Sequence, residues 1–231
     1  MGISLVLWVV LLSAVNAMYS QSMGVSYQNV FDVNRVYDKA SGKHINADKV
    51  QRIIRDNPNI VFEQVIDKYG NIESRLLDTL KLSRKGNRDI SKRVQKGEPF
   101  PPFVMKSLSN RILDSEKLKG GIILIQFQLM FREPFLKIKT IEEFEELVSE
   151  FRKTMNLEAI ILTDSSKSEI LENIDTSKYI SEFVPDGRNF NEKYLVVSFP
   201  SIVLIDTNGN LVSYYDPDEI DKLKLDIGKL N

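Results

Sequence analysis

The 231-residue sequence contains no cysteine and a single histidine, and both scarcities restrict its chemistry. Without cysteine there is no disulfide, no thiolate metal site and no cysteine nucleophile. The one histidine, His44, cannot build a zinc site without other strong ligands, and no Asp/Glu cluster accompanies it at ligand spacing. We therefore expect a structural or solvent-exposed role for His44, no metal site and no cofactor. The missing thiols do not identify the compartment.

Strong net charge and the common catalytic motifs are also missing. The 31 basic and 32 acidic residues give a formal charge of −1, so nothing favours nucleic acid as a partner. No serine lies in a G-x-S-x-G context, and Lys119-Gly-Gly is too short for a phosphate loop. Carboxylate pairs such as Asp216/Asp218 and Glu142/Glu143 fit helix starts, where they complement the helix dipole. We expect no catalytic residues.

The N-terminus contains a short hydrophobic run. Residues 3–12 are apolar except for Ser4, and small residues follow up to Ala17, although no Lys or Arg precedes the run. This pattern resembles a secretory signal peptide over residues 1–17. The run is shorter than the roughly 20 apolar residues that span a bilayer. We expect export, periplasmic or secreted, with no stable membrane insertion after cleavage; the alternative is an N-terminally membrane-anchored protein.

Residues 18–96 are expected to form a small α+β extension that ends in a linker. Short apolar runs separated by turn residues predict strands, and Asn46 can cap a helix over residues 47–55. Residues 81–96 are strongly charged and poor in large apolar side chains. This composition indicates the linker.

Residues 97–231 alternate between predicted strands and helices. The run 122–129 is apolar except for two glutamines, as suits a central strand with both faces covered. Thr140 and Glu143 have the spacing of a capping box for the helix that follows. An apolar strand is predicted over residues 157–163. Strand, helix and strand in this order imply a parallel pair with a right-handed crossover.

The end of the chain predicts a β-hairpin and a closing helix. Asn208-Gly209 is a strong signal for a tight turn between two strands, residues 202–205 and 211–214. Asp216-Pro-Asp-Glu then suits the first turn of a helix, because proline is tolerated there.

Four separated elements in this second region resemble, in order, the thioredoxin-like domain of the TlpA-like and redoxin families. They are Gly97-Glu-Pro-Phe-Pro-Pro-Phe, Lys119-Gly-Gly before an apolar strand, Phe131-Arg-Glu-Pro-Phe, and Phe199-Pro-Ser-Ile-Val-Leu-Ile-Asp. The resemblance implies an α/β, three-layer fold over residues 97–231, with a central mixed sheet flanked by helices. It also implies that Pro200 follows a cis peptide bond and faces residues 131–135.

Residues 131–135 occupy the place where these families carry Trp-Cys-x-Pro-Cys, at a strand-to-helix turn. Arg132 and Phe135 fall on the two cysteine positions, with Glu133 and Pro134 between them. Thiol–disulfide exchange needs an attacking thiolate and a resolving thiol. We therefore interpret these four residues as vestigial active-site positions. Arg132 could bind an anion at the helix N-terminus; the alternative that we favour is a loop that has lost its function.

The expected function is that of an exported, redox-inactive thioredoxin-like protein that binds a protein or peptide partner, as an adaptor or chaperone-like module. The backbone edge beside a cis-proline can pair with an extended peptide. We place Phe131, Phe199 and Pro200 at that contact, although Phe131 and Phe135 could also pack on Pro200 or in the core. The alternatives are a divergent enzyme with a cysteine-free site around Arg132 and a structural subunit of a larger assembly. The partner and the oligomeric state stay open.

Overall fold

The computed structural model describes residues 31–80, 82 and 89–230. The predicted signal peptide, residues 1–17, therefore lies outside the described residues. Residues Val33–Asn231 form one compact unit, and only this unit is described below. The predicted domain division at residues 96 and 97 stays a prediction. Within the described ranges, no helix is long and apolar enough to cross a bilayer.

The first part of this unit is a small sheet with one helix. A 3₁₀ helix (Val33–Arg35) precedes β1 (Val36–Asp38), and α2 (Ala47–Asp56), β2 (Glu63–Ile66) and β3 (Ile72–Leu77) follow. The sheet order is β1-β3-β2, with β1 parallel and β2 antiparallel to β3. The buried apolar side chains between α2 and the sheet are Val36, Ile45, Val50 and Leu77.

Asn46 caps α2 as predicted, because its side-chain oxygen accepts a hydrogen bond from the Asp48 amide at 2.8 Å. His44 is exposed, and its Nε2 lies 2.9 Å from the Asn34 carbonyl oxygen. Its ring packs edge-on against Tyr37, with the centroids 5.5 Å apart. These contacts agree with a structural role for the single histidine.

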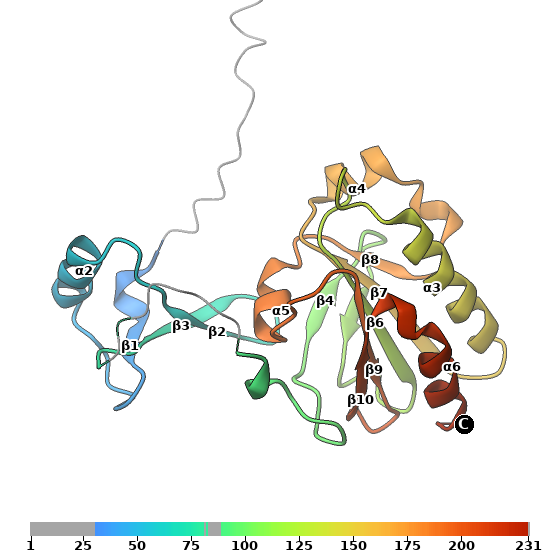
Figure 1. Cartoon of the computed structure of the whole chain (residues 1–231), viewed down its shortest axis with the longest axis horizontal. Helices are drawn as coiled ribbons and strands as arrows, with labels where there is room; N and C mark the ends of the chain where they lie inside the picture. The colour runs from blue at the N-terminus through green and yellow to red at the C-terminus, as the bar shows by residue number, and fades with distance from the viewer. Residues whose placement is uncertain (1–30, 81, 83–88, 231) are drawn as a thin grey trace, which may run out of the picture. The chain divides into compact units, whose positions relative to one another are not determined.

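The larger sheet has five strands, with α3 and α6 beside it (Figure 1). Its order is β10-β9-β6-β7-β8, with β6, β7 and β8 parallel and β9 and β10 antiparallel to their neighbours. The strands are β6 (Ile122–Gln128), β7 (Leu157–Thr163), β8 (Glu182–Val184), β9 (Ser201–Ile205) and β10 (Leu211–Tyr215). The predicted parallel pair and the predicted mixed sheet are both confirmed.

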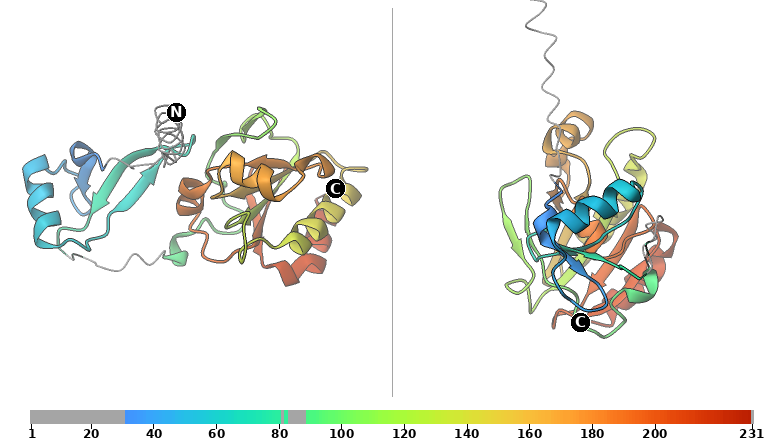
Figure 2. Two further views of the ribbon diagram at one scale, coloured as in Figure 1. Left: turned by 90° about the horizontal axis from the view of Figure 1, so that it is seen from above. Right: turned by 90° about the vertical axis from the view of Figure 1, so that its left-hand side faces the viewer.

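Both faces of the large sheet are covered, which gives the three predicted layers. Alternate side chains of each strand point to opposite faces, and all seven residues of β6 are buried. Figure 2 shows α3 and α6 together against one face and α5 on the other. The first face is covered by α3 (Ile138–Phe151), α4 (Lys167–Asn173) and α6 (Ile220–Gly228), and the second by α5 (Arg188–Lys193) and the hairpin of β4 (Val104–Lys106) and β5 (Ile112–Asp114).

The end of the chain follows the predicted turn chemistry. The carboxylate of Asp206 accepts hydrogen bonds from the Asn208 and Asn210 amides at 2.9 and 2.8 Å, and Gly209 takes a φ of +87° that favours glycine. Asp216 begins a capping box that leads through a 3₁₀ helix (Pro217–Glu219) into α6. Two further 3₁₀ helices lie at Ile90–Lys92 and Thr176–Lys178.

The helix after β6 starts at Ile138, before the predicted cap, so the predicted capping box at Thr140 and Glu143 is wrong. Residue Lys137 precedes the first residue of α3 and caps it without a side-chain hydrogen bond. Thr140 lies inside the helix, where its hydroxyl donates to the Lys137 carbonyl at 2.8 Å and accepts from the Gln128 amide at 3.2 Å. The buried glutamine of β6 needs a partner, and Thr140 supplies it.

Candidate functional site

The predicted vestigial positions follow β6, at the carboxyl end of the central strands. The loop of residues 129–137 is fastened to the end of β7. The Leu129 carbonyl accepts hydrogen bonds from the Asp164 amide at 3.1 Å and the Thr163 hydroxyl at 3.2 Å. The Phe131 amide donates to the Ser165 hydroxyl at 2.8 Å. The loop is therefore held by main-chain contacts to the β7–α4 connection.

Residues 132–136 form a closed turn that is separate from α3. The amides of Phe135 and Leu136 both donate to the Arg132 carbonyl, at 2.8 and 2.9 Å. The Glu133–Pro134 peptide bond is cis, which the sequence did not predict. The predicted strand-to-helix turn at residues 131–135 is wrong in its helical part, because α3 begins only at Ile138. All four vestigial side chains, residues 132–135, are exposed.

Pro200 lies at the same end of the sheet as this loop. β9 runs antiparallel to β6 with Ser201 opposite Phe127, so Pro200 reaches the level at which β6 passes into the loop. The Phe199–Pro200 bond is cis, as the resemblance implied. Phe199 and Pro200 are partly exposed, and Val197 is 51% exposed. The resemblance and the sheet register thus agree on which segments share this edge.

The main-chain groups just before Pro200 have no hydrogen-bond partner within the described part of the chain. No hydrogen bond there involves the amide or carbonyl groups of Val197, Ser198 or Phe199. The Ser198 hydroxyl donates to the Asp216 carboxylate at 3.3 Å. Three consecutive residues with free main-chain groups form a short edge to which another chain can hydrogen-bond.

Phe131 is not at the surface, which corrects its place among the predicted contact residues. Its side chain is 0% exposed and packs edge-on against Phe183, with the ring centroids 5.8 Å apart. Phe135 is 42% exposed. The aromatic side chain that a partner can reach at this loop is therefore Phe135, and Phe131 belongs to the core between α3 and the sheet.

Arg132 has a carboxylate partner on the neighbouring helix. Its Nε lies 3.4 Å from the Glu169 carboxylate of α4, and both groups are partly exposed. Arg132 also lies in the closed turn, six residues before the first residue of α3, so it is not at the N-terminus of that helix. Both observations weigh against the predicted anion site.

Polar residues that the sequence analysis did not select also lie near this edge. The buried Asn191 of α5 donates from its amide to the Asp164 carboxylate at 2.6 Å. Asp186 has a φ of +57°, and burial raises its pKa above the ordinary value. Among residues 31–80, 82 and 89–230, no three His, Cys, Asp or Glu side chains gather as they would around a metal ion.

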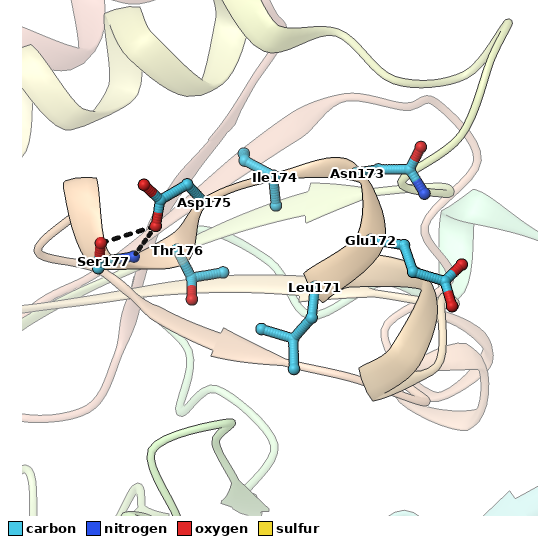
Figure 3. A pocket seen from close by; sticks show the side chains of 7 residues that line it. All are labelled: Leu171, Glu172, Asn173, Ile174, Asp175, Thr176 and Ser177. Atoms are coloured by element: carbon cyan, nitrogen blue, oxygen red, sulfur yellow. Dashed lines mark hydrogen bonds between the residues drawn. The ribbon is translucent and has the colours of Figure 1, made fainter.

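A shallow depression lies at the far end of α4. Figure 3 shows that residues 171–177, one continuous segment, line it. The Asp175 carboxylate accepts hydrogen bonds from the hydroxyl and amide of Ser177, at 2.6 and 3.2 Å, and they lower its pKa. The Asp175 carboxylate therefore stabilises the turn in which it lies. Because its lining residues all come from one stretch of seven consecutive residues, this depression is a weaker candidate than the edge beside Pro200.

Comparison with known proteins decides the fold. No family model matches the chain. It is 25% identical over 118 residues to the thioredoxin-like protein YneN of Bacillus subtilis, covering 50% of this chain and 68% of that protein. A solved structure from Chlorobium tepidum, assigned as a thiol:disulfide interchange protein DsbE, superimposes with a TM-score of 0.50. The chain has the thioredoxin-like fold.

The match covers nearly the whole length of each of two solved structures. The Chlorobium protein is 14% identical, with 98% of its length and 59% of this chain covered. A Bacteroides vulgatus protein, assigned as a thiol-disulfide oxidoreductase, is 20% identical with a TM-score of 0.50, over 99% of its length and 61% of this chain. The recognition of a thioredoxin-like domain is confirmed. The chain contains no cysteine, so it lacks the thiols for disulfide exchange. The placement of Arg132 and Phe135 on the two cysteine positions stays a prediction.

The double variant Arg132→Cys with Phe135→Cys is expected to form an intramolecular disulfide on oxidation. Both side chains are exposed, and the turn brings the residue 135 amide to within 2.8 Å of the residue 132 carbonyl. Because α3 begins at Ile138, we expect both thiols to keep an ordinary pKa of about 8.5. Non-reducing mass spectrometry detects the bond, and alkylation rate against pH gives the pKa. The single Arg132→Cys variant is the control; failure of the pair to oxidise would refute this placement.

Proposed function

We propose that this chain is an exported, redox-inactive thioredoxin-like protein that binds an extended segment of a protein partner at the edge beside Pro200. The observation that carries the proposal is the free main chain of residues 197–199, next to the partly exposed Pro200 on a thioredoxin-like sheet that has no thiol. Such an edge binds through main-chain hydrogen bonds, which need no cysteine.

Two surface side chains support a role in binding. Phe135 and Val197 are 42% and 51% exposed, and both belong to segments that meet the same end of the sheet. An extended peptide that pairs with residues 197–199 would present alternate side chains to its surroundings. Apolar side chains of that peptide could then contact Phe135 or Val197. This contact favours an adaptor or chaperone-like module.

Export is supported by the sequence alone. The hydrophobic run of residues 3–12 and the small residues before Ala17 suit a cleaved signal peptide. The alternative of an enzyme around Arg132 has less support, since its guanidinium pairs with Glu169.

A photo-crosslinking experiment tests the binding site in the full chain. A benzophenone amino acid replaces Phe135, and a second variant carries it at Leu225 of α6, which is 67% exposed. We expect reduced, carboxymethylated α-lactalbumin, an extended chain without free thiols, to cross-link to position 135 and not to position 225. Equal cross-linking at both positions, or none at position 135, would contradict the proposed site.

A redox assay tests the other half of the proposal. The chain is expected to reduce insulin in the presence of dithiothreitol no faster than dithiothreitol alone, because it holds no thiol for the relay. Turbidity from precipitated insulin chains measures the rate. A rate above the reductant-only blank would refute redox inactivity. It would not affect the conclusion about the binding site, which the cross-linking experiment tests separately.

A further inference from the structure

The turn between β2 and β3, residues 67–71, is built as a rigid tip. The Asp67 carboxylate accepts hydrogen bonds from the Tyr69 and Asn71 amides, both at 2.8 Å. The Asp67 amide donates in turn to the Asn71 carbonyl at 3.0 Å. Gly70 has a φ of +82°, a conformation that side chains disfavour. The tip therefore holds its shape through its own contacts, and its remaining carbonyl groups are free to accept other donors.

Those carbonyl groups accept hydrogen bonds from β4 and α5. The Lys68 carbonyl accepts from the Val104 amide at 2.6 Å. The Gly70 carbonyl accepts from the Asn189 side-chain amide at 2.8 Å. Gly70 also lies against the ring of Phe190, since a Cβ added there would come within 2.8 Å of that ring. The tip is thus bound by direction-specific contacts and by close packing.

Lys193 joins the same tip to the loop before β4. Its Nζ donates to the Asp67 carbonyl at 3.0 Å and to the Pro102 carbonyl at 2.6 Å. Burial lowers the pKa of Lys193, and the charge of Asp67 opposes that shift. A partly buried ammonium group needs such acceptors. Lys193 is the last residue of α5, so these bonds fix the point where the chain leaves that helix.

A second contact holds the chain between α5 and Pro200. The Arg93 guanidinium donates from Nε and Nη2 to the Leu195 carbonyl, at 2.9 and 2.7 Å. Leu195 has a φ of +54°, which is unfavourable for a branched side chain without support. The guanidinium carbon also lies 4.7 Å from the centre of the Tyr214 ring of β10. Arg93 therefore fixes the carbonyl at this strained position.

We propose that the β2–β3 tip and Arg93 form an internal clamp that orders the segment from α5 to Pro200 and so positions the edge of residues 197–199. Residues 67–71 of the same chain are the segment that packs against α5 and β4. The clamp rests on contacts within the chain; only its consequence for partner binding rests on the proposed function. Residues 67–71 and Arg93 thereby acquire a role as positioning elements for the edge.

Hydrogen–deuterium exchange of the full chain tests the clamp with a matched pair of glycine variants. Gly70→Ala places a methyl group against Phe190, whereas Gly42→Ala meets nothing within 4 Å at a similar φ of +68°. We expect the hydrogen-bonded amides within residues 188–196, such as those of Tyr194 and Val196, to exchange about tenfold faster in Gly70→Ala and at the wild-type rate in Gly42→Ala. Equal exchange in the two variants would overturn the clamp.

Lys193→Met is a second variant that does not disturb the backbone of the tip. It removes the bonds to Asp67 and Pro102 and keeps an unbranched side chain that is one atom shorter. We expect faster exchange of the hydrogen-bonded amides within residues 188–196 and weaker α-lactalbumin cross-linking at position 135. Unchanged exchange would overturn the clamp whatever the partner. Faster exchange in a chain that never cross-links above the position 225 control would retain the clamp and reject the proposed function.

Discussion

Phe131→Ala is expected to lower the free energy of unfolding by about 3–5 kcal/mol, the range for truncating a buried aromatic side chain. The Phe131 side chain is 0% exposed and contacts the ring of Phe183 between the sheet and its helices. Truncation leaves a cavity next to the loop that carries the vestigial positions. Urea unfolding of the full chain, followed by circular dichroism, measures the change.

Phe135→Ala is the matched control, four residues away in the same loop. Because that ring is 42% exposed, its loss should change the free energy of unfolding by no more than about 0.5 kcal/mol. Binding should follow the opposite order: Phe135→Ala should weaken α-lactalbumin binding in a pull-down, while folded Phe131→Ala should retain it. Similar destabilisation by the two variants would show that the loop does not separate an inner from an outer aromatic position.

The second large effect is expected at Glu158, where Glu158→Ala should destabilise the chain by about 1–3 kcal/mol. Its carboxylate, 11% exposed, accepts two hydrogen bonds from Arg111 and lies 3.3 Å from Arg152. Removing this carboxylate takes one acceptor from each arginine, while Arg111 keeps Glu182 at 3.6 Å and Arg152 keeps the Leu157 and Ile180 carbonyls. The arginine side chains are 45% and 31% exposed, so water recovers part of the loss and we place the effect below that of a fully buried pair.

Glu143→Ala provides the comparison for an exposed ion pair. Glu143 lies 3.4 Å from Lys139 on the surface of α3, where the lysine is 87% exposed. We expect a change within about 0.5 kcal/mol, and salt should reduce it further. Urea midpoints of both variants at low and high salt distinguish the two pairs. An effect of Glu158→Ala as small as that of Glu143→Ala would show that the bidentate contact adds nothing to stability.

The sequence predicted those elements whose signal lies within a few residues. β7 has the predicted bounds, Leu157–Thr163, because a continuous apolar strand between polar segments has little freedom in its limits. The hairpin of β9 and β10 follows from Asn208-Gly209, and α2 from its cap. β8 and α5 were missed, since they are three and six residues long and depend on their place against the sheet.

The candidate site was predicted in position more successfully than in detail. The sheet register brings Pro200 and the loop after β6 to one edge, as the resemblance implied. Whether Phe131 or Phe135 is buried could not be read from two phenylalanines in one short loop, because tertiary packing decides it. Arg132 pairs with Glu169, which lies 37 positions further along the chain, and no local sequence pattern predicts such a pair. Long-range pairing is the part that a single sequence leaves open.

The paired glutamines of β6 determine how α3 can lie on the sheet. Gln126 donates to the Thr140 carbonyl at 3.1 Å and Gln128 to the Thr140 hydroxyl at 3.2 Å, both from buried positions. Apolar side chains alone would tolerate a helix that slides by one turn, whereas a displaced α3 would leave both amides without acceptors in the core. Both hydrogen bonds that fix the helix to the strand end at one residue, Thr140. The distance that the loop between them must bridge is therefore fixed. An insertion or deletion in residues 129–137 has to change the conformation of the exposed turn and not the position of α3.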